Sequence, residues 1–452
     1  MNGAGSSGPT AAALAARITG RTATRIADDI RRAVDSGVLR AGVRMPTIRA
    51  LAAELQVSPT TVSEAWHQLT RAGVLRSAGR RGTFVVHPGG MSHLHTASGV
   101  ITTHLGDGGP DPALLPPLDE AINAGLRAPG LHAHDFAYLT PELLRAVRRT
   151  WPFEPEAWTS TEGGSHASFL AISVLADRGG PIALEQPTTP RVHTLLHHLR
   201  VPVLEVPWDA HGPQPQELRK ALEAGATAFV VQLRGHVPTG LRVTERRLAE
   251  MVAVLRDFPD VIVFEDDNLG PLLRDPDPSM GAELPGRVLK VRSYTPAFGL
   301  DLRTGVLAGP EPLIRAVNLA RGMAGVWTSR ILQNALAHLL TDPVTARHVA
   351  RAGRRYRSRR GSLVSALARH GVHVDGEEGL IIWVPVHSEE DAVERLASVG
   401  VVSGPGAPCW FGTPPRPYIR VPTSLLPDGG GAQVNQLAEV IAEVADPDGS
   451  VA

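Results

Sequence analysis

Two short stretches of this sequence have residue types and spacing that could do chemistry. Residues 163–166 (GGSH) stand at the expected start of a helix, where free backbone N–H groups and the helix dipole can hold an anion. His193 and His197 would share one face of another helix, a spacing that two metal ligands could use. That helix holds no acidic residue and the sequence offers no obvious third ligand, so a solvated or core role is favoured for both histidines. We therefore expect an anion site and no metal site.

The basic residues indicate a second kind of chemistry, because they gather in the first 88 residues. This segment holds 12 Arg and no Lys against 5 Asp and Glu, a net charge of +7. The whole chain is neutral, so the remainder carries a net charge of −7. A basic module on a balanced chain is typical of a protein that binds the phosphate backbone of nucleic acid. The alternative is a helical module that binds protein and whose charges are merely solvated.

The elements that would carry these basic residues are three short helices and a hairpin. Apolar residues at helical spacing, together with N-cap and stop signals, predict helices over residues 22–36, 48–55 and 59–72. Ser58 is the N-cap acceptor of the third helix, and Pro59 suits its first position because the missing N–H costs nothing there. Two short strands, over residues 74–75 and 83–86, would flank a basic turn.

This stretch resembles the winged helix-turn-helix of GntR-type transcription regulators. Three motifs of that family recur here with small changes. They are Pro-x-x-Arg-x-Leu-Ala at residues 46–52 (PTIRALA), Ser-x-x-Thr-Val at residues 58–62 (SPTTV) and Gly-x-Gly-Thr-Phe at residues 79–84 (GRRGTF). The resemblance implies that this module binds double-stranded operator DNA and that its third helix reads bases.

The third helix departs from the family pattern at two positions. Many relatives have Arg directly after the Ser cap and again four residues further on, where this chain has Pro59 and Ser63. Base readout is therefore expected to rely less on Arg–guanine pairs, and the recognised sequence to differ. The DNA-binding residues that the resemblance then implies are Arg49, Ser58, Thr60, Thr61, Ser63 and His67 in the helices, and Arg80, Arg81 and Gly82 in the wing.

Length and composition bound the rest of the chain. At 452 residues it is too long for one core, and 43% hydrophobic with 20% charged residues is ordinary for a soluble protein. The lone Cys409 excludes an internal disulfide framework and a cysteine metal cluster, and it fits a reducing cytoplasm. No run approaches the roughly 18 apolar residues of a membrane span. We therefore expect no contact with a membrane.

We expect four segments along the chain. A flexible tail over residues 1–13 precedes the winged helix-turn-helix domain, residues 14–88. A polar linker that contains Gly and Ser follows over residues 89–104. Residues 105–450 would form the second domain, with a smaller lobe that starts at about residue 341.

From residue 105 onward, short apolar runs alternate with helical stretches rich in Ala, Leu and Arg. The candidate strands of the larger lobe lie at residues 182–185, 201–206, 228–232, 261–265 and 288–292. Strand–helix alternation predicts an α/β fold whose mostly parallel sheet is covered on both faces. A long Arg-rich helix over about residues 343–370 and a final strand near residues 418–421 indicate that the smaller lobe is of α+β type.

Six motifs of this second domain, in order, resemble those of the fold-type I aminotransferase domain. They lie at residues 106–112 (GDGGPDP), 185–187 (EQP), 238–240 (PTG), 265–267 (EDD), 302–305 (LRTG) and 418–421 (YIRV). The resemblance covers nearly all of residues 105–440. The order of the two domains resembles the MocR subgroup of GntR-type regulators. The resemblance implies a homodimer that forms through the larger lobe, and a pocket that in relatives holds pyridoxal phosphate.

The residues that this resemblance assigns to cofactor chemistry are missing. Pyridoxal phosphate needs a Lys for its aldimine, and the family places it seven residues before the Arg of Leu-Arg-x-Gly, which is Pro296 here. The only lysines are Lys220, on a helix that looks exposed, and Lys290, on the preceding strand. Three further contacts of the family, an Asn and two Tyr, are replaced by Val237, Asn268 and Thr189.

Apart from Asp266, the groups that remain are those that can hold an anion. The resemblance assigns to a ligand pocket the residues Gly164, Ser165, His166, Asp266, Ser293, Thr295, Arg303 and Arg420. A structural role is the alternative for three of them. Asp266 could be a helix-cap or loop partner, and Arg303 and Arg420 could form interdomain salt bridges.

We therefore expect a transcription regulator whose aminotransferase-like domain is catalytically inactive and senses a small anionic effector. The phosphate or carboxylate of that effector would bridge Arg303 and Arg420 and shift the population of two arrangements of the DNA modules. No cofactor is expected, and covalent pyridoxal phosphate is disfavoured. Two alternatives remain. One is a working pyridoxal-phosphate enzyme fused to a DNA-binding module, which would need Lys290, or no lysine at all, to support the aldimine. The other is a regulator that binds pyridoxal phosphate non-covalently.

Overall fold

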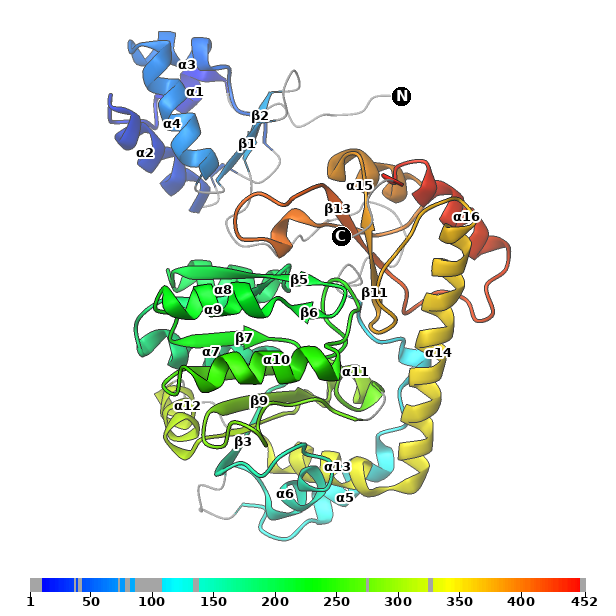
Figure 1. Ribbon diagram of the computed structural model, residues 1–452. Coiled ribbons are helices and arrows are strands. Elements are labelled where there is room, and N and C mark those ends of the chain that lie inside the picture. The colour runs from blue at the N-terminus through cyan, green and yellow to red at the C-terminus, as the bar shows by residue number, and fades with distance from the viewer. Residues whose placement is uncertain are drawn as a thin grey trace. The chain divides into compact units, whose positions relative to one another are not determined.

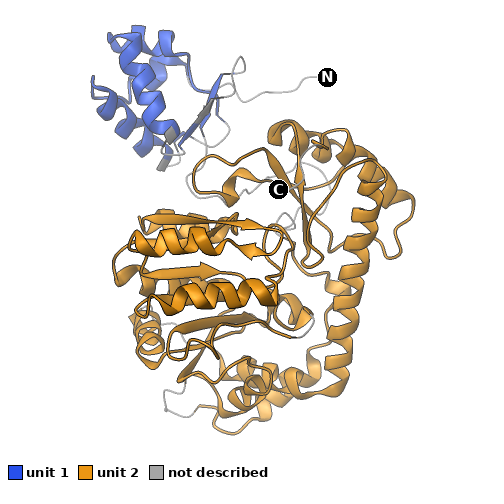
Figure 2. Cartoon of the chain, viewed as in Figure 1, with its two compact units in different colours: residues 1–93 blue, residues 94–452 orange. Residues whose placement is uncertain are grey.

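The computed structural model describes residues 10–35, 38–39, 43–71, 74–77, 82–85, 108–132, 138–273, 276–323 and 328–447. The chain divides into two compact units, residues 1–93 and residues 94–452, which Figure 2 shows in two colours. Residues 1–9, the predicted domain boundary at residue 88 and the predicted linker over residues 89–104 lie outside the described residues.

The first unit is a winged helix-turn-helix. Its elements in chain order are α1 (Ala11–Ala15), α2 (Ala23–Asp35), α3 (Ile48–Leu55), α4 (Pro59–Arg71), β1 (Leu75–Ser77) and β2 (Thr83–Val85) (Figure 1). The two strands pair antiparallel. The three predicted helices and the predicted hairpin are thereby confirmed. Their apolar faces meet in one core, in which Ile30, Leu51 and Leu69 are fully buried.

The predicted flexible tail over residues 1–13 is wrong at its C-terminal end. Thr10 caps α1 because its Oγ1 accepts the Ala13 N–H at 3.2 Å. Leu14 and Ile18 lie in the core of the unit with 1% and 4% exposure, and α1 packs on α3. The sequence hides this helix because five residues that are mostly Ala carry one large apolar side chain, too few to set a period.

The second unit is built on one eight-stranded sheet in the order β3-β10-β9-β8-β7-β4-β5-β6. Its strands are β3 (Ala157–Thr161), β4 (Ile182–Gln186), β5 (Val203–Asp209), β6 (Gly212–Pro213), β7 (Ala228–Val231), β8 (Ile262–Asp267), β9 (Val288–Ser293) and β10 (Gly305–Gly309). The strands β5, β4, β7, β8 and β9 run parallel to one another. β10 is antiparallel to both of its neighbours, and β6 is antiparallel to β5. The predicted α/β fold with a mostly parallel sheet is confirmed.

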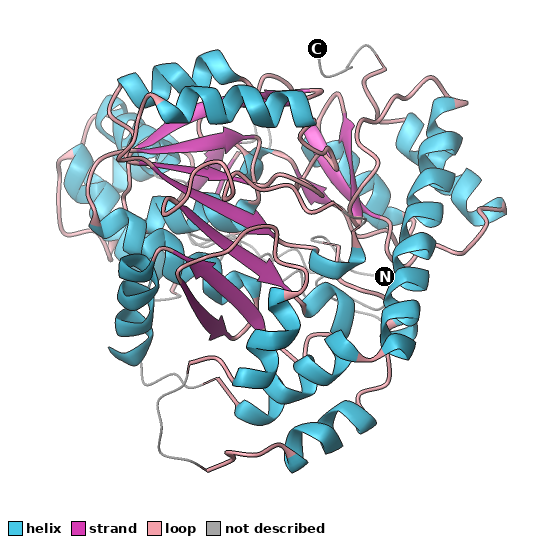
Figure 3. Cartoon of the chain, turned by 60° about the horizontal axis from the view of Figure 1, so that its bottom comes forward, coloured by secondary structure: helices cyan, strands magenta, loops and turns pink. Residues whose placement is uncertain are grey.

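Helices cover both faces of this sheet (Figure 3), and accordingly every residue of β4, β7, β8 and β9 is buried. The helices of the larger lobe are α5 (Asp119–Arg127), α6 (Pro141–Arg148), α7 (Gly164–Asp177), α8 (Pro190–His198), α9 (Pro215–Glu223), α10 (Glu245–Arg256), α11 (Thr295–Phe298), α12 (Glu311–Met323) and α13 (Arg330–Thr341). On one face α7, α8 and α12 pack against Val230 and Phe264. On the other face α9 and α10 pack against Phe229 and Val263. Consecutive residues of one strand therefore point to opposite faces.

The smaller lobe packs three strands against helices. It contains α14 (Pro343–Ala368), β11 (Ile381–Pro385), α15 (Glu389–Ser398), β12 (Gly404–Pro405), β13 (Tyr418–Pro422) and α16 (Ala432–Ala442), with the strands in the order β11-β13-β12. α14 is capped by Asp342, whose carboxylate accepts the N–H groups of Val344 and Thr345. The predicted α+β lobe is confirmed. Across the described ranges, no helix combines the length and the apolar character that crossing a bilayer requires.

Candidate functional site

Helix α4 presents a polar surface whose first turn is fixed by a cap. The Oγ of Ser58 accepts the Thr61 N–H at 3.1 Å and lies 2.8 Å from the Oγ1 of Thr61. Ser58 and Thr61 are thus engaged with each other. Thr60 and His67 are exposed, and Ser63 is half-buried. Two of the predicted DNA-binding residues therefore hold the start of the helix, while Thr60 and His67 face outward.

A further Arg lies beside the wing of this unit. Arg49 is exposed on α3, as expected. Gly82 has a φ of +108°, and a Cβ at this position would lie 2.8 Å from the Nε of Arg44. Arg44 is exposed, forms an isolated bridge with β2 and was overlooked in the sequence, because only the fold brings this connector to the wing. Arg80 and Arg81 lie outside the described residues.

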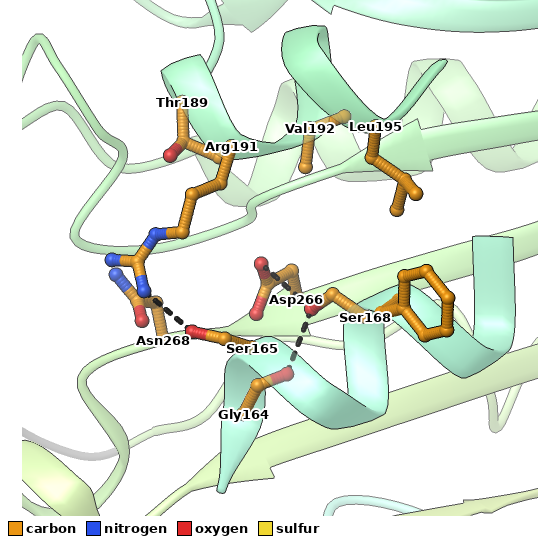
Figure 4. Close-up of a pocket in the computed structure, with 10 residues that line it drawn as sticks. Gly164, Ser165, Ser168, Thr189, Arg191, Val192, Leu195, Asp266 and Asn268 are labelled. Atoms are coloured by element: carbon orange, nitrogen blue, oxygen red, sulfur yellow. Dashed lines mark hydrogen bonds between the residues drawn. The ribbon is translucent and has the colours of Figure 1, made fainter. Parts of the chain in front are cut away.

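A cavity of about 200 Å³ lies in the second unit beside the first turns of α7 and α8 and the C-terminal end of β8 (Figure 4). It is lined by Gly164, Ser165, Ser168, Phe169, Thr189, Arg191, Val192, Leu195, Asp266 and Asn268. Three of the predicted ligand residues, Gly164, Ser165 and Asp266, therefore surround one space. Thr189 and Asn268, where two cofactor contacts of the aminotransferase family are replaced, line the same space.

Two glycines place the start of α7 at this cavity. Gly163 is the N-cap with a φ of +84°, and a Cβ there would lie 3.3 Å from the Oγ1 of Thr295. A Cβ on Gly164 would lie 2.7 Å from the Cβ of Ser293. Glycine is therefore required once for the backbone conformation and once for close packing on β9. Thr295 and Ser293 support the helix start, and Ser165 reaches the cavity.

Asp266 is the only acidic residue among the described lining residues, and it is 9% exposed. The Oγ of Ser168 lies 3.5 Å from its Oδ2. Burial raises the pKa of Asp266 to about 6, although the positive charge of Arg191 opposes the rise. A buried carboxyl group with such a pKa changes its protonation state close to neutral pH. The cavity therefore holds a group of variable charge.

Arg191 supplies the positive charge of the cavity, and sequence reasoning missed it. It follows Pro190 at the start of α8, and its Nη1 donates to the Oγ of Ser165 at 2.5 Å. Its side chain thus crosses from α8 to α7 (Figure 4). The sequence gives no signal for this role, because Arg191 is an ordinary polar residue of an amphipathic helix and belongs to none of the family motifs.

The other predicted ligand residues lie outside the lining of the cavity. The Nδ1 of His166 pairs with the carboxylate of Glu162. Arg303 is exposed, and its Nη2 lies 3.5 Å from the carbonyl oxygen of Glu162. Arg420 is 8% exposed, and its Nε donates to the carbonyl oxygen of Pro405 at 3.3 Å. The two arginines expected to bridge one ligand are therefore held by different elements, the turn before α7 and the strand β12.

Lys290 lies on the face of the sheet opposite the cavity. In the parallel pair of β8 and β9, Lys290 stands opposite Glu265, and Val291 stands opposite Asp266. Because consecutive residues point to opposite faces, Lys290 and Asp266 are on different sides of the sheet. The Nζ of Lys290 lies 3.3 Å from the Glu265 carboxylate and 3.2 Å from that of Asp277, and the residue is 1% exposed.

Lys220, the second lysine, and Pro296, at the family position of the cofactor lysine, also lie outside the lining of the cavity. Lys220 lies on α9, which covers the same far face as Lys290, and its Nζ is 2.7 Å from the Glu217 carboxylate. Pro296 is half-buried in the short helix α11. Neither lysine of the chain therefore lines the cavity.

Lys290 belongs to a buried ion network on this far face. Arg234 and Arg292 each pair with both Asp267 and Asp277. Burial acts against ionisation of Asp267, yet Arg234, Lys290 and Arg292 together hold its pKa well below the usual range. The side chains of this network that belong to β8 and β9 alternate with those that face the cavity.

Of the two histidines on α8, His193 packs on an aromatic ring and His197 is exposed. The ring of His193 lies on that of Phe411 with centroids 4.2 Å apart. Burial, and then the neighbouring His197, lowers the pKa of His193. Within the residues that the structure describes, no group of three His, Cys, Asp or Glu side chains is placed to hold a metal ion.

Comparison with known proteins gives the same two-part division. Residues 22–85 match the bacterial regulatory proteins of the gntR family, and residues 120–430 match aminotransferase class I and II. The chain is 30% identical over 430 residues to the vitamin B6 salvage pathway transcriptional repressor PtsJ of Salmonella typhimurium, which covers 93% of this chain and 98% of that protein. It is 28% identical over 363 residues to the HTH-type pyridoxine biosynthesis transcriptional regulator PdxR of Corynebacterium glutamicum, which covers 76% of this chain and 78% of that protein.

Solved structures share the fold of the second unit. The α-aminoadipate aminotransferase LysN of Thermus thermophilus superposes with a TM-score of 0.67 and 22% identity, over 75% of this chain and 92% of that chain. An archaeal alanine:glyoxylate aminotransferase gives a TM-score of 0.67 and 19% identity, over 77% of this chain and 91% of that chain.

The raised pKa of Asp266 predicts a pH-dependent gain in stability from Asp266→Asn. A group whose pKa is higher in the folded state favours folding fully below its unfolded value, and this contribution is lost as the pH rises through about 6. Between pH 4 and pH 7 the free energy of unfolding of the variant should therefore rise relative to wild type by about 2–3 kcal/mol. Urea denaturation at both pH values measures it, with Asp301→Asn at an exposed position as control. A difference that stays constant with pH would contradict the buried carboxyl.

Proposed function

Because this chain belongs to the aminotransferase class I and II family and carries a gntR-family DNA-binding domain, it is a transcription regulator of the GntR/MocR type, and we propose that its aminotransferase-like domain senses a small anionic ligand and catalyses no reaction. Pyridoxal phosphate, where a protein of this family binds it, supplies an electron sink that depends on a Schiff base with a lysine. The proposal therefore depends on where the two lysines of this chain lie.

The direction of Lys290 is the observation that carries catalytic inactivity. Lys290 could reach the face of the sheet that carries Asp266 only if β9 shifted by one residue. That shift would turn the buried apolar residues Leu289 and Val291 to the opposite face. The move would also leave Glu265 as an uncompensated buried charge, at a cost of roughly 3–5 kcal/mol. The residues present thus do not fit a covalently bound pyridoxal phosphate, and we derive no catalytic step through it.

Ligand sensing is supported by what the cavity keeps. Its lining combines the guanidinium of Arg191, the hydroxyl of Ser165 at the start of α7, and the buried carboxyl group of Asp266. A fixed positive charge beside a helix N-terminus favours an anion, because the positive end of the helix dipole adds to it. The proposed effector is therefore a small anion.

We propose that the regulator acts on operator DNA in the cytoplasm as a homodimer. An effector that binds one arrangement of the two DNA-binding domains more tightly than another would shift the population between them. The dimer geometry would then set the spacing of the half-sites on the operator.

A regulator that binds pyridoxal phosphate non-covalently is the second candidate. It is favoured by the names of two relatives, which concern vitamin B6 salvage and pyridoxine biosynthesis. It is also compatible with Asp266, whose carboxylate could accept a hydrogen bond from a protonated pyridine nitrogen. The same cavity would serve both candidates.

DNA binding is tested by electrophoretic shift on the DNA upstream of the chain's own gene. Arg49→Ala and His67→Ala should each weaken binding roughly 5- to 50-fold, because both residues are exposed on the helices that face the grooves in this fold. Arg145→Ala on α6 of the second unit, whose side chain is 68% exposed, is the matched control and should leave binding unchanged. Absence of any shift at low salt, or equal loss in the control, would end this part of the proposal.

Catalytic inactivity is tested by borohydride reduction of the full chain with pyridoxal phosphate, followed by peptide mass spectrometry. No pyridoxyl group should appear on Lys290, because it is buried on the far face. Lys220, whose side chain is 69% exposed, reports non-specific labelling within the same sample. Stoichiometric labelling of Lys290 that depends on Asp266 would refute the proposal.

A further inference from the structure

The cavity contains a cation, Arg191, that forms no close ion pair with a carboxylate among the described residues, although its charge acts on Asp266 through space. Arg191 is exposed, and its one hydrogen-bond partner in the described residues is the Oγ of Ser165, which occupies one of its five N–H donors. This guanidinium therefore has donors to spare. It is therefore the group in the cavity that is best placed to exchange a weak neutral partner for an anion.

The geometry of the donors suits an oxyanion. A planar guanidinium offers parallel N–H groups that match the two oxygens of a carboxylate or phosphate. The Ser165 hydroxyl lies 2.5 Å from Nη1 of Arg191. A ligand oxygen bound to the guanidinium would therefore have this hydroxyl, at the start of α7, as a second donor. Gly164 lines the same point without a side chain that could block the approach.

The remaining walls of the cavity are apolar on one side. Phe169 from α7 and Val192 and Leu195 from α8 line it, and Phe169 is 47% exposed. A large aromatic side chain that is half open beside a cavity loses apolar contact with water when a ligand covers it. A ligand whose charged end lies at Arg191 and whose apolar body lies against these three residues would thus contact both the polar and the apolar side of the lining.

Asp266 sets what kind of ligand charge is tolerated. It is the acidic residue of the lining, and the positive charge of Arg191 acts on it through space. The cavity therefore already contains a cation for this carboxyl group. A second cation from the ligand would be repelled by Arg191, whereas a single oxyanion would be attracted to it.

We infer that Arg191 is the residue that recognises the effector, and that the effector is a small organic anion whose one acidic group, a carboxylate or a phosphate, binds to Arg191 and Ser165 and whose apolar body lies against Phe169, Val192 and Leu195. This inference rests on the proposed ligand-sensing function and names its ligand class. It moves the anion contact from Arg303 and Arg420, which lie outside the lining, to a residue of α8.

Calorimetry on the full chain tests the inference with four probes. Benzoate and phenyl phosphate carry the two oxyanions on an apolar ring, benzamide is a neutral analogue, and inorganic phosphate lacks the apolar body. We expect at least one of the aromatic anions to bind at least tenfold more tightly than benzamide and than inorganic phosphate. The tighter of the two identifies the oxyanion as carboxylate or phosphate. Equal affinity for benzamide, or no binding of either aromatic anion, would overturn the inference.

Variants separate the role of Arg191 from the presence of a cavity. Arg191→Gln should weaken the aromatic anion at least tenfold, and Arg191→Lys should restore part of the loss because it keeps the charge without the fork. Arg178→Gln, an exposed Arg at the other end of α7, is the matched control and should bind as wild type does. The melting temperature of Arg191→Gln should stay close to that of wild type, because the side chain is exposed. Unchanged affinity in Arg191→Gln would refute the assignment.

The outcomes distinguish this inference from the proposed function. A chain that shifts operator DNA and takes no adduct on Lys290, but binds neither aromatic anion, refutes the ligand class and leaves the regulator intact. A chain that binds no operator DNA refutes the regulator, whatever it does with benzoate.

Discussion

The alternation of side chains along two neighbouring buried strands determines what the second domain can do. β8 and β9 run parallel in fixed register, with residues 265–267 paired to residues 290–292. Asp266 faces the cavity, and Glu265 and Asp267 on either side of it face away together with Lys290. A slip of β9 by one residue would turn its apolar residues Leu289 and Val291 to the face that carries the ion network. The lysine that could have formed an aldimine is therefore kept from the cavity by the register of the sheet.

The ion network on the far face reinforces this register. Arg234, Arg292 and Lys290 neutralise Asp267, Asp277 and Glu265, so the described network balances three positive charges with three negative ones. In a low dielectric such a set is stable only when complete, because removing one member leaves a buried charge without a partner. The same strands that carry this network carry Asp266, so the network also fixes the carboxyl group of the cavity. The ion network on one face of the sheet thus positions the carboxyl group of Asp266 on the other face.

Sequence alone predicted the parts of this molecule that depend on local pattern. The helices of the winged domain and the central strands follow from apolar period, caps and breakers, and Asp266, which was expected in a ligand pocket, lines the cavity. The strands β3 and β10 were missed because they pair with each other across distant segments of the chain. The helix α1 was missed because it is too short to show a helical apolar period. Arg191 and Arg44 were missed, and Arg303 and Arg420, which were expected to bridge one ligand, lie outside the lining of the cavity. Motifs give family positions, whereas the reach of a long side chain depends on packing that no local pattern encodes.

The central claim that we propose is that an aminotransferase fold without a usable lysine reports a ligand to a DNA-binding domain. The affinity for operator DNA, measured with and without a saturating concentration of the aromatic anion that binds, tests this claim most directly in wild type and in Arg191→Gln. Coupling between two sites typically changes affinity by roughly 5- to 150-fold, and we predict a change of this order in wild type and none in the variant. Operator affinity that stays the same in wild type when the ligand site is saturated would contradict the claim.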